Sequence, residues 1–246
     1  MSPVLRFRAS SPRRGFSLVE LLTVLAIVGL LAAIVLPGLL SIQRARALSV
    51  ASSDIASLLE QARTHAMANN TYVYVGLFEA DATRTDTGTR VSGIGRIYVQ
   101  VAASRDGTNG YQNGDWDSSN LAAVGPLRSF DGVHLVRDGA VIHAALGSMD
   151  ASDGSNIDLS SPPTTPFAGP VGSAQRVCIF DSVIQFSPAG AASVVTSLSG
   201  VAAVRPYIQF GLEPARGNQA ATVLANCAGF QIDGITGSIQ VFRPSK

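Results

Sequence analysis

The sequence of 246 residues is poor in the side chains from which metal and nucleophilic sites are built. It has two cysteines, three histidines and a single lysine, which is its last residue. Cys178 and Cys227 stand far apart and match no metal-ligand spacing, and the histidines form no HExxH motif. Serine-nucleophile, phosphate-loop and dinucleotide motifs are also lacking. We therefore expect no enzyme, no resident metal and no cofactor, and we interpret His65, His134 and His143 as ordinary structural or surface residues.

Acidic residues are missing from the first 15 positions, which contain four arginines: Arg6, Arg8, Arg13 and Arg14. Without this segment the chain keeps 14 basic against 17 acidic residues, a net charge of −3. Non-specific nucleic-acid binding usually needs an excess of basic residues, which this part of the chain does not have, so nucleic acid is not an expected partner. A DNA-uptake or adhesive specialisation would need an arginine cluster, for which the candidates are Arg84, Arg90, Arg96 and Arg105.

Formal charge is also absent from residues 21–43. A helix of this length measures about 34 Å, close to the thickness of a bilayer's hydrocarbon core. Because arginines precede the apolar run and none lies within it, we expect the N-terminus to stay in the cytoplasm and the rest to be exported. An ordinary secretory signal has a shorter apolar core followed by a small-residue cleavage site, whereas Leu31-Ala32-Ala33 lies inside a run that continues to Ile42.

Glu20 stands near the start of this apolar run. A carboxylate in hydrocarbon costs on the order of 2 to 3 kcal/mol on insertion scales, so it should have a partner. Cleavage between Gly15 and Phe16 would create an α-amine four residues from Glu20, on the same helix face. That amine, or the amine of a neighbouring subunit, could compensate the carboxylate.

The segment GFSLVE at residues 15–20, followed by an apolar helix, closely resembles the cleavage and methylation signature of type IV prepilins and type II secretion pseudopilins. The resemblance implies that a prepilin peptidase removes residues 1–15 as a basic leader after Gly15, and then N-methylates Phe16. It also implies that Glu20 pairs with the amine of an adjacent subunit during assembly. Pro37 matches a position where pilins commonly carry proline, and a proline inside a helix predicts a kink.

Residues 43–69 carry apolar side chains at helical spacing and continue the helix, with Asn69-Asn70 as its stop. Strand-like segments rich in aromatic and β-branched residues follow at 71–78, 94–101, 133–136, 177–186, 207–212 and 239–242. Two turn-rich loops, 105–120 and 147–172, separate some of them. The sequence thus predicts a pilin-like α+β fold: a transmembrane helix at 16–42, its extramembrane continuation at 43–69, and a mainly antiparallel β-sheet head at 70–246.

Several segments beyond the membrane helix resemble the GspH/FimT-type minor pseudopilins and minor pilins. They are the helix end at 58–70, the strand YVQV at 98–101, the loop RDGTNG at 105–110, FSPAG at 186–190 and ITGSIQV at 235–241. The family resemblance implies a minor subunit of a periplasmic type II secretion pseudopilus, with a minor pilin of a type IV pilus as the alternative. Its expected partners are prepilin peptidase, other pilin or pseudopilin subunits and an inner-membrane assembly platform. The expected location is the inner membrane, crossed once, with the N-terminus in the cytoplasm and the head in the periplasm or an extracellular filament.

The two cysteines allow two interpretations. In an oxidising compartment an even pair favours a disulfide between Cys178 and Cys227, which both lie in or beside strand-like segments. The alternative is two buried free thiols that pack as small hydrophobic side chains. Sequence cannot choose between them, because it does not give the distance between the two residues.

The loop at 105–120 offers hard oxygen ligands that could hold calcium, namely Asp106, Asn109, Asp115 and Asp117. Their spacing fails the EF-hand pattern, and an exposed polar turn is the alternative. Trp116 lies among these residues, where we expect it to pack against the head rather than to contact a partner.

Overall fold

The computed structural model describes most of residues 17–244. Outside the described part are residues 1–16, 85–87, 89, 113–114, 147–156, 161–162, 164–166, 172–176, 197–204, 221–225 and 245–246, together with the side chains of 34–45, 140, 143–145 and 157–158. The chain divides into two compact units, Met1–Ile42 and Gln43–Lys246. The second unit is the head.

Helix α1 (Leu18–Asn69) supplies one wall of the head with its second half. Six of its apolar side chains are almost completely buried: Leu48, Ala51, Ile55, Leu59, Ala62 and Ala66. Steps of three and four residues place them in one stripe along the helix. Half of them are alanines, which let the neighbouring strands approach the helix backbone closely.

The end of α1 is closed by its own backbone. Asn70 has a φ of 50°, in the left-handed region that asparagine tolerates better than most residues. The N–H of Thr71 then donates to the carbonyl oxygen of Ala66 at 3.0 Å, which is the bond of a Schellman motif. The helix stop expected at Asn69-Asn70 is confirmed, and the chain turns directly into the first strand.

The first sheet, called sheet one, is antiparallel and is centred on the hairpin of β1 and β2. Its strand order is β12 (Ala192–Val194), β11 (Ser182–Phe186), β1 (Val73–Asp81), β2 (Gly95–Ser104) and β5 (Leu121–Ala123), with β6 (Arg128–Asp131) also paired to β2. Val73, Val75 and Leu77 of β1 face α1, whereas Tyr74 and Phe78 face away from it. Sheet one is therefore buried on both faces.

The second sheet, called sheet two, is built around β13 (Tyr207–Arg216). Its order is β14 (Gln219–Ala220), β13, β15 (Ala228–Asp233) and β16 (Ile239–Phe242), and β7 (Val133–Val136) and β8 (Ile157–Asp158) also pair with β13. Every pairing is antiparallel except that of β8 with β13. The predicted α+β class with mainly antiparallel sheets is thus confirmed.

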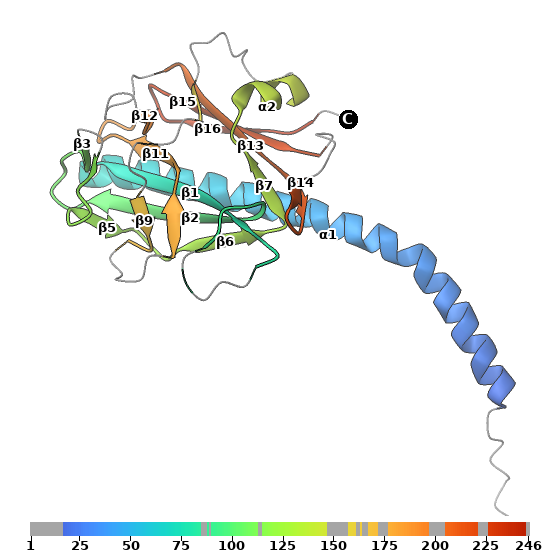
Figure 1. Cartoon of the computed structure of the whole chain (residues 1–246). Coiled ribbons are helices and arrows are strands. Elements are labelled where there is room, and N and C mark those ends of the chain that lie inside the picture. Colours follow the sequence, from blue (N-terminus) through green and yellow to red (C-terminus); the bar gives the residue numbers. More distant parts are fainter. Residues whose placement is uncertain are drawn as a thin grey trace, which may run out of the picture. The chain divides into compact units, whose positions relative to one another are not determined.

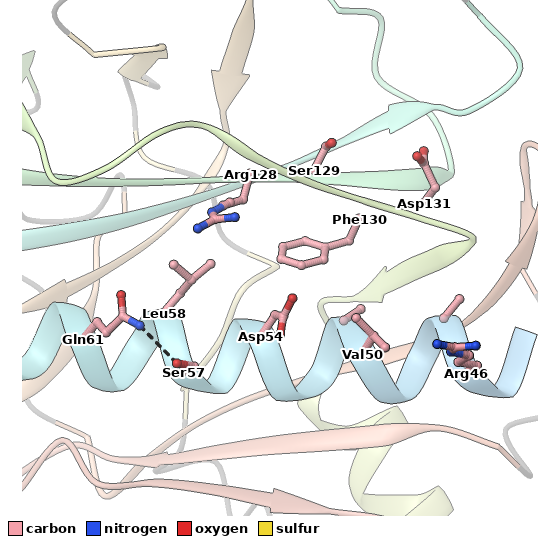
Figure 2. Close-up of a pocket in the computed structure, with 12 residues that line it drawn as sticks. Arg46, Val50, Asp54, Ser57, Leu58, Gln61, Arg128, Ser129, Phe130 and Asp131 are labelled. Atoms are coloured by element: carbon pink, nitrogen blue, oxygen red, sulfur yellow. Dashed lines mark hydrogen bonds between the residues drawn. The ribbon is translucent and has the colours of Figure 1, made fainter.

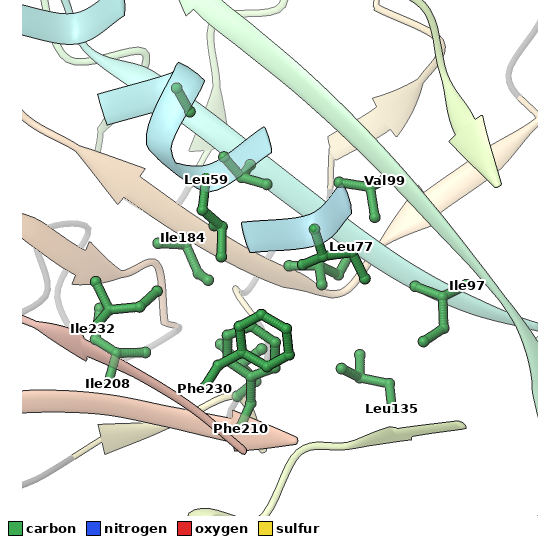
Figure 3. Close-up of a cluster of buried hydrophobic side chains, with 14 of the residues drawn as sticks. Leu59, Leu77, Ile97, Val99, Leu135, Ile184, Ile208, Phe210, Phe230 and Ile232 are labelled. Carbon is green, nitrogen blue, oxygen red and sulfur yellow. The ribbon is translucent and has the colours of Figure 1, made fainter. Parts of the chain in front are cut away.

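One core joins α1 and both sheets. In the view of Figure 1, β13, β15 and β16 lie above the head part of α1, and β2, β5 and β6 lie below it. Leu59 of α1, Ile184 of β11 and Ile232 of β15 meet in this core (Figure 3). At its centre the rings of Phe210 and Phe230 stack at 4.7 Å between centroids, with planes 3° apart. Helix and sheets therefore share their buried apolar surface and stabilise one another.

Each sheet is also covered on its outer face. Sheet one carries the hairpin of β9 (Phe167–Gly169) and β10 (Cys178–Phe180) and the short pair β3 (Tyr111–Gln112) and β4 (Asp115–Trp116), which enclose an aromatic cluster. Sheet two carries α2 (Gly139–Leu146), whose Ile142 and Leu146 pack beside Val136 and Cys227. The described residues of the head thus form three clusters of buried side chains rather than one.

Candidate functional site

The first turn of α1 carries one half of a capping box, in which Glu20 reaches back to Ser17. The N–H of Leu21 donates to the carbonyl oxygen of Ser17 at 3.1 Å, so Ser17 is the N-cap residue. The carboxylate of Glu20 reaches back and accepts a hydrogen bond from the N–H of Ser17 at 3.4 Å. This is the Ser-x-x-Glu arrangement, in which the residue at the third helical position caps the chain before it. Glu20 therefore has a weak partner within its own chain.

The helix surface that follows Glu20 is apolar on all sides. Ten large apolar side chains expose more than half of their surface: Leu18, Val19, Leu21, Leu22, Val24, Leu25, Ile27, Val28, Leu30 and Leu31. Glu20 is the sole charged residue between positions 18 and 33. A continuous apolar surface of this kind marks contact with a membrane or with other proteins.

Part of the predicted membrane span at 16–42 lies outside the residues that the structure describes. Within the described residues, no helix combines the length and the apolar character needed to cross a membrane. The side chains of 34–45 lie outside those residues. α1 is helical through Pro37, but the side chain of this proline is among those not described, and the kink stays a prediction.

Gly15 and Phe16, the residues of the predicted cleavage and methylation site, lie outside the described residues. The sequence model of the family described as the prokaryotic N-terminal methylation motif matches residues 10–36, which include both of them and Glu20. The chain carries the N-terminus of a type IV pilin-like prepilin. No curated protein and no solved structure matches the chain. The motif implies that this pilin-like chain is processed by prepilin peptidase and assembles with other subunits.

A groove of about 620 Å³ runs between α1 and β6 of the head. The apolar side chains of Val50, Leu58 and Phe130 line it (Figure 2). Arg46 and Asp54 of α1 and Arg128 of β6 also line it, and within the part of the chain that the structure describes these three form no ion pair with one another. The pilin-like chain therefore presents an open surface with charges of both signs beside its helix.

The predicted disulfide between Cys178 and Cys227 is not formed in the structure. Both residues are buried free thiols. Cys178 lies in the aromatic cluster outside sheet one, whereas Cys227 lies under α2 outside sheet two. Two layers of the fold separate these clusters, so the even number of cysteines did not indicate a pair. The alternative of two small buried hydrophobic side chains is the one that the structure shows.

We expect both thiols to react slowly in the folded protein and fully after unfolding. Burial raises the pKa of Cys178 to about 11 and also raises the pKa of Cys227, which keeps the reactive thiolate scarce at neutral pH. The exported protein is denatured without reductant and treated with an alkylating reagent. Mass spectrometry of the product should then show two labels per chain. Prior reduction is the control and should change nothing. A chain that takes up labels only after reduction would restore the disulfide.

The four calcium candidates act as hydrogen-bond acceptors in their own loop. Asp106 accepts from the N–H of Thr108 at 2.9 Å and from the side-chain amide of Asn120 at 2.6 Å, which lowers the pKa of this carboxyl. The side-chain oxygen of Asn109 accepts from the hydroxyl of Tyr74 at 2.6 Å. The remaining two accept from backbone or hydroxyl groups next to them: Asp115 from Trp116, and Asp117 from Ser119. Among the described residues, no group of three or more His, Cys, Asp or Glu could hold a metal ion.

Trp116 packs against the head, as predicted. Its ring meets those of Tyr74 at 5.0 Å, Tyr111 at 4.7 Å and Phe167 at 5.1 Å. Edge and tilted contacts of this kind each add about 0.5 to 1.5 kcal/mol beyond burial. Aromatic packing therefore holds the loop at 105–120 against sheet one. Hydrogen bonds to its own carboxylates stabilise the turns within the loop.

The arginines considered for a DNA-binding or adhesive cluster have contacts within the head. Arg96 pairs with Asp131 across β2 and β6. The guanidinium of Arg90 lies 5.6 Å from the centre of the Tyr98 ring, and the side chain of Arg105 donates to the carbonyl oxygen of Leu121 at 3.3 Å. These side chains fasten strands and loops, which favours a structural role for them.

Proposed function

We propose that the chain is a minor pseudopilin, a structural subunit of a periplasmic pseudopilus that drives type II protein secretion. The observation that carries the proposal is the methylation motif at 10–36, which includes the apolar helix surface at 18–31 with Glu20 as its one charge. A protein with this N-terminus is useful as an assembled subunit rather than as a catalyst. We therefore assign no reaction to it.

The membrane arrangement is part of the same proposal. The arginines of the leader stay in the cytoplasm, residues 16–42 anchor the chain in the inner membrane, and the head lies in the periplasm. Prepilin peptidase meets the chain at the cytoplasmic end of that anchor. An inner-membrane assembly platform then takes up the processed chain together with other pseudopilins. The groove beside α1 offers such neighbours apolar side chains and charges of both signs.

The GspH/FimT-type minor subunits are the branch that we propose. Support comes from the order of the resembling segments in the head. The helix end is capped by Asn70 and continues into β1, YVQV lies in β2, and ITGSIQV forms the turn and strand after β15. Each match is short, but together they follow the order of elements that the resemblance implies.

Deleting the gene should separate the secretion pseudopilus from the type IV pilus. We expect loss of extracellular secreted enzymes, which accumulate in the periplasm, while surface pili and twitching motility persist. A plasmid copy of the native chain should restore secretion. If the deletion removed pili or twitching and left secretion intact, the chain would be a minor pilin instead. If neither changed, the proposed assembly role would be wrong.

A further inference from the structure

A histidine held between two carboxylates connects sheet one to sheet two. The Nδ1 atom of His134 in β7 lies 2.9 Å from Oε1 and 3.0 Å from Oε2 of Glu79, which is in β1. Its Nε2 atom lies 3.9 Å from Oε1 of Glu213, which is opposite His134 in the register of β13 and β7. Both ring nitrogens thus face a carboxylate, one from each sheet.

The two carboxylates are buried, and the imidazole is within reach of water. Glu79 is 4% exposed and Glu213 is 5% exposed, whereas the side chain of His134 is 22% exposed. Glu79 also accepts a hydrogen bond from the N–H of Gly95 at 3.0 Å. A neutral imidazole could donate to one carboxylate but not to both, and buried carboxylates without a counter-charge are costly. A protonated His134 donates to Glu79 and places its charge between both acids.

Burial alone would lower the pKa of His134. The hydrogen bond to Glu79 and the charges of Glu79 and Glu213 outweigh this effect, with Arg137 opposing them, so the pKa of His134 is raised above 6.5. Burial also raises the pKa of Glu213, the positive charge of His134 lowers it, and Glu79 raises it further. Each carboxylate therefore favours the proton on the ring between them.

The charged residues around His134 are paired with groups other than Glu79 and Glu213. Arg137, the next charged residue after His134, is paired with Asp181 at 2.7 Å. On β2, Arg96 is paired with Asp131. Next to β15, the thiol of Cys227 is close enough to Glu213 for the carboxylate to raise its pKa. From α2 the titratable group is His143, whose side chain lies outside the described residues.

The histidine lies beside the backbone link between the sheets. Gly132 donates to the carbonyl oxygen of Gly95 at 2.8 Å, and the N–H of Ala215 donates to the carbonyl oxygen of Gly132 at 2.9 Å. A Cβ at Gly132 would lie 3.8 Å from that of Ala47, so this link is next to α1. The contact of His134 with the two carboxylates therefore stabilises the place where β7, β13 and the start of β2 meet.

We propose that His134 is a proton-binding site that links the two sheets of the head. Its protonated form stabilises the contact between the sheets, so that this contact is more stable in mildly acidic medium than in alkaline medium. Protonated His134 bridges Glu79 of sheet one and Glu213 of sheet two. When the proton leaves, two buried carboxylates face each other across a neutral ring, and the edge formed by β7 and β13 opens more readily. The proposal concerns the head alone and does not depend on which filament the chain enters.

The sign follows from the direction of the pKa. Because folding raises the pKa of His134, its contribution to stability is complete below about pH 6.5 and is lost as the pH rises through the folded value. Each unit by which the pKa is raised corresponds to roughly a tenfold change in the ratio of closed to open states. Glu213 has a raised pKa as well, so its own contribution also declines with rising pH, from its ordinary value of 4.5 upward.

The test is amide hydrogen exchange of the full processed chain in detergent micelles, with rates corrected for the intrinsic effect of pH. Between pH 6 and pH 9 the opening constant of amides in β7 and β13 should rise about tenfold per unit of pKa elevation in the native protein. In His134→Gln the constant should already be high at pH 6 and should rise less with pH than in the native protein. The matched control is His65→Gln, a histidine on α1 without a carboxylate contact in the described part, and it should behave as the native protein does.

Two results would overturn the proposal. One is an equal pH dependence in the native protein and His134→Gln. The other is a titration of the His134 ring at or below pH 6.5, measured by nuclear magnetic resonance on the native chain, which remains decisive even if the variant fails to fold. Glu79→Gln should bring the titration of His134 back toward its ordinary value, an effect that loss of packing alone would not produce.

Discussion

Glu20→Val should enter the membrane and lose its leader as the native chain does, but it should fail to join filaments. The apolar run is long enough to insert without Glu20, and valine removes a costly carboxylate from it. What we expect the variant to lose is the predicted attraction between that carboxylate and the amine at Phe16 of a neighbour. Hydrogen bonds to charged groups contribute about 1.5 to 3 kcal/mol, so incorporation should fall roughly 10- to 150-fold. Membrane level, leader removal and recovery in sheared or crosslinked filaments measure the three steps separately.

The capping box supplies matched controls for this variant. Glu20→Gln keeps an oxygen that can accept from the N–H of Ser17 but removes the charge, so it should fail as valine does. Ser17→Ala removes the N-cap side chain and keeps the charge, so it should be incorporated. If glutamine assembled normally, Glu20 would act by starting the helix rather than by pairing with an amine. Normal assembly of the valine variant would leave Glu20 without a role in assembly.

Gly15→Leu should block processing completely. We predict that the peptidase cuts between Gly15 and Phe16, within the matched motif at 10–36, and a large side chain next to that bond should exclude the chain from a site that accepts glycine. Mass spectrometry of the native membrane protein should show an N-terminus at Phe16 that carries one methyl group, whereas the variant should retain all of residues 1–15. Without processing no amine forms at Phe16, so the variant should not assemble either.

Gly29→Leu is the control for this substitution. It makes the same change within the apolar part of α1, where a Cβ would meet no atom within 4 Å. The variant should be processed and methylated like the native chain. A native N-terminus at residue 1, or one near Ile34, would show that the cleavage site has been placed wrongly.

Local patterns determined the first third of the chain. Residues 10–36 carry a motif that is recognised as a linear sequence, so its residues can be assigned without a fold. The helix and its stop were also predictable, because the apolar stripe from Leu48 to Ala66 follows helical spacing and Asn70 can adopt the left-handed conformation that ends it. In the head, strands with many β-branched and aromatic residues were found near their true positions, notably β1, β2, β7, β13 and β16.

Other elements could not be predicted because their neighbours stabilise them. β15 contains Gly229, yet it is fixed by pairing with β13 on one side and β16 on the other. α2 is eight residues long and begins with glycine; it is placed by Ile142, which packs directly over Gly211 of β13. The segment 177–186, predicted as one strand, is two strands that separate at Asp181, where the chain leaves the β9 hairpin and enters sheet one.

The sequence by itself determined that the chain carries an N-terminal methylation motif at 10–36, and it predicted the leader, the cleavage and methylation site, and the role of Glu20. These depend on residues adjacent in the chain and on the length and charge of one helix. Only the tertiary structure decided which distant side chains meet. It put Cys178 and Cys227 in separate layers, and it brought Glu79 and Glu213 to the two nitrogens of His134. The reason is physical: the face of a strand follows from the sequence, but the strand across from it is chosen by the packing of the whole head.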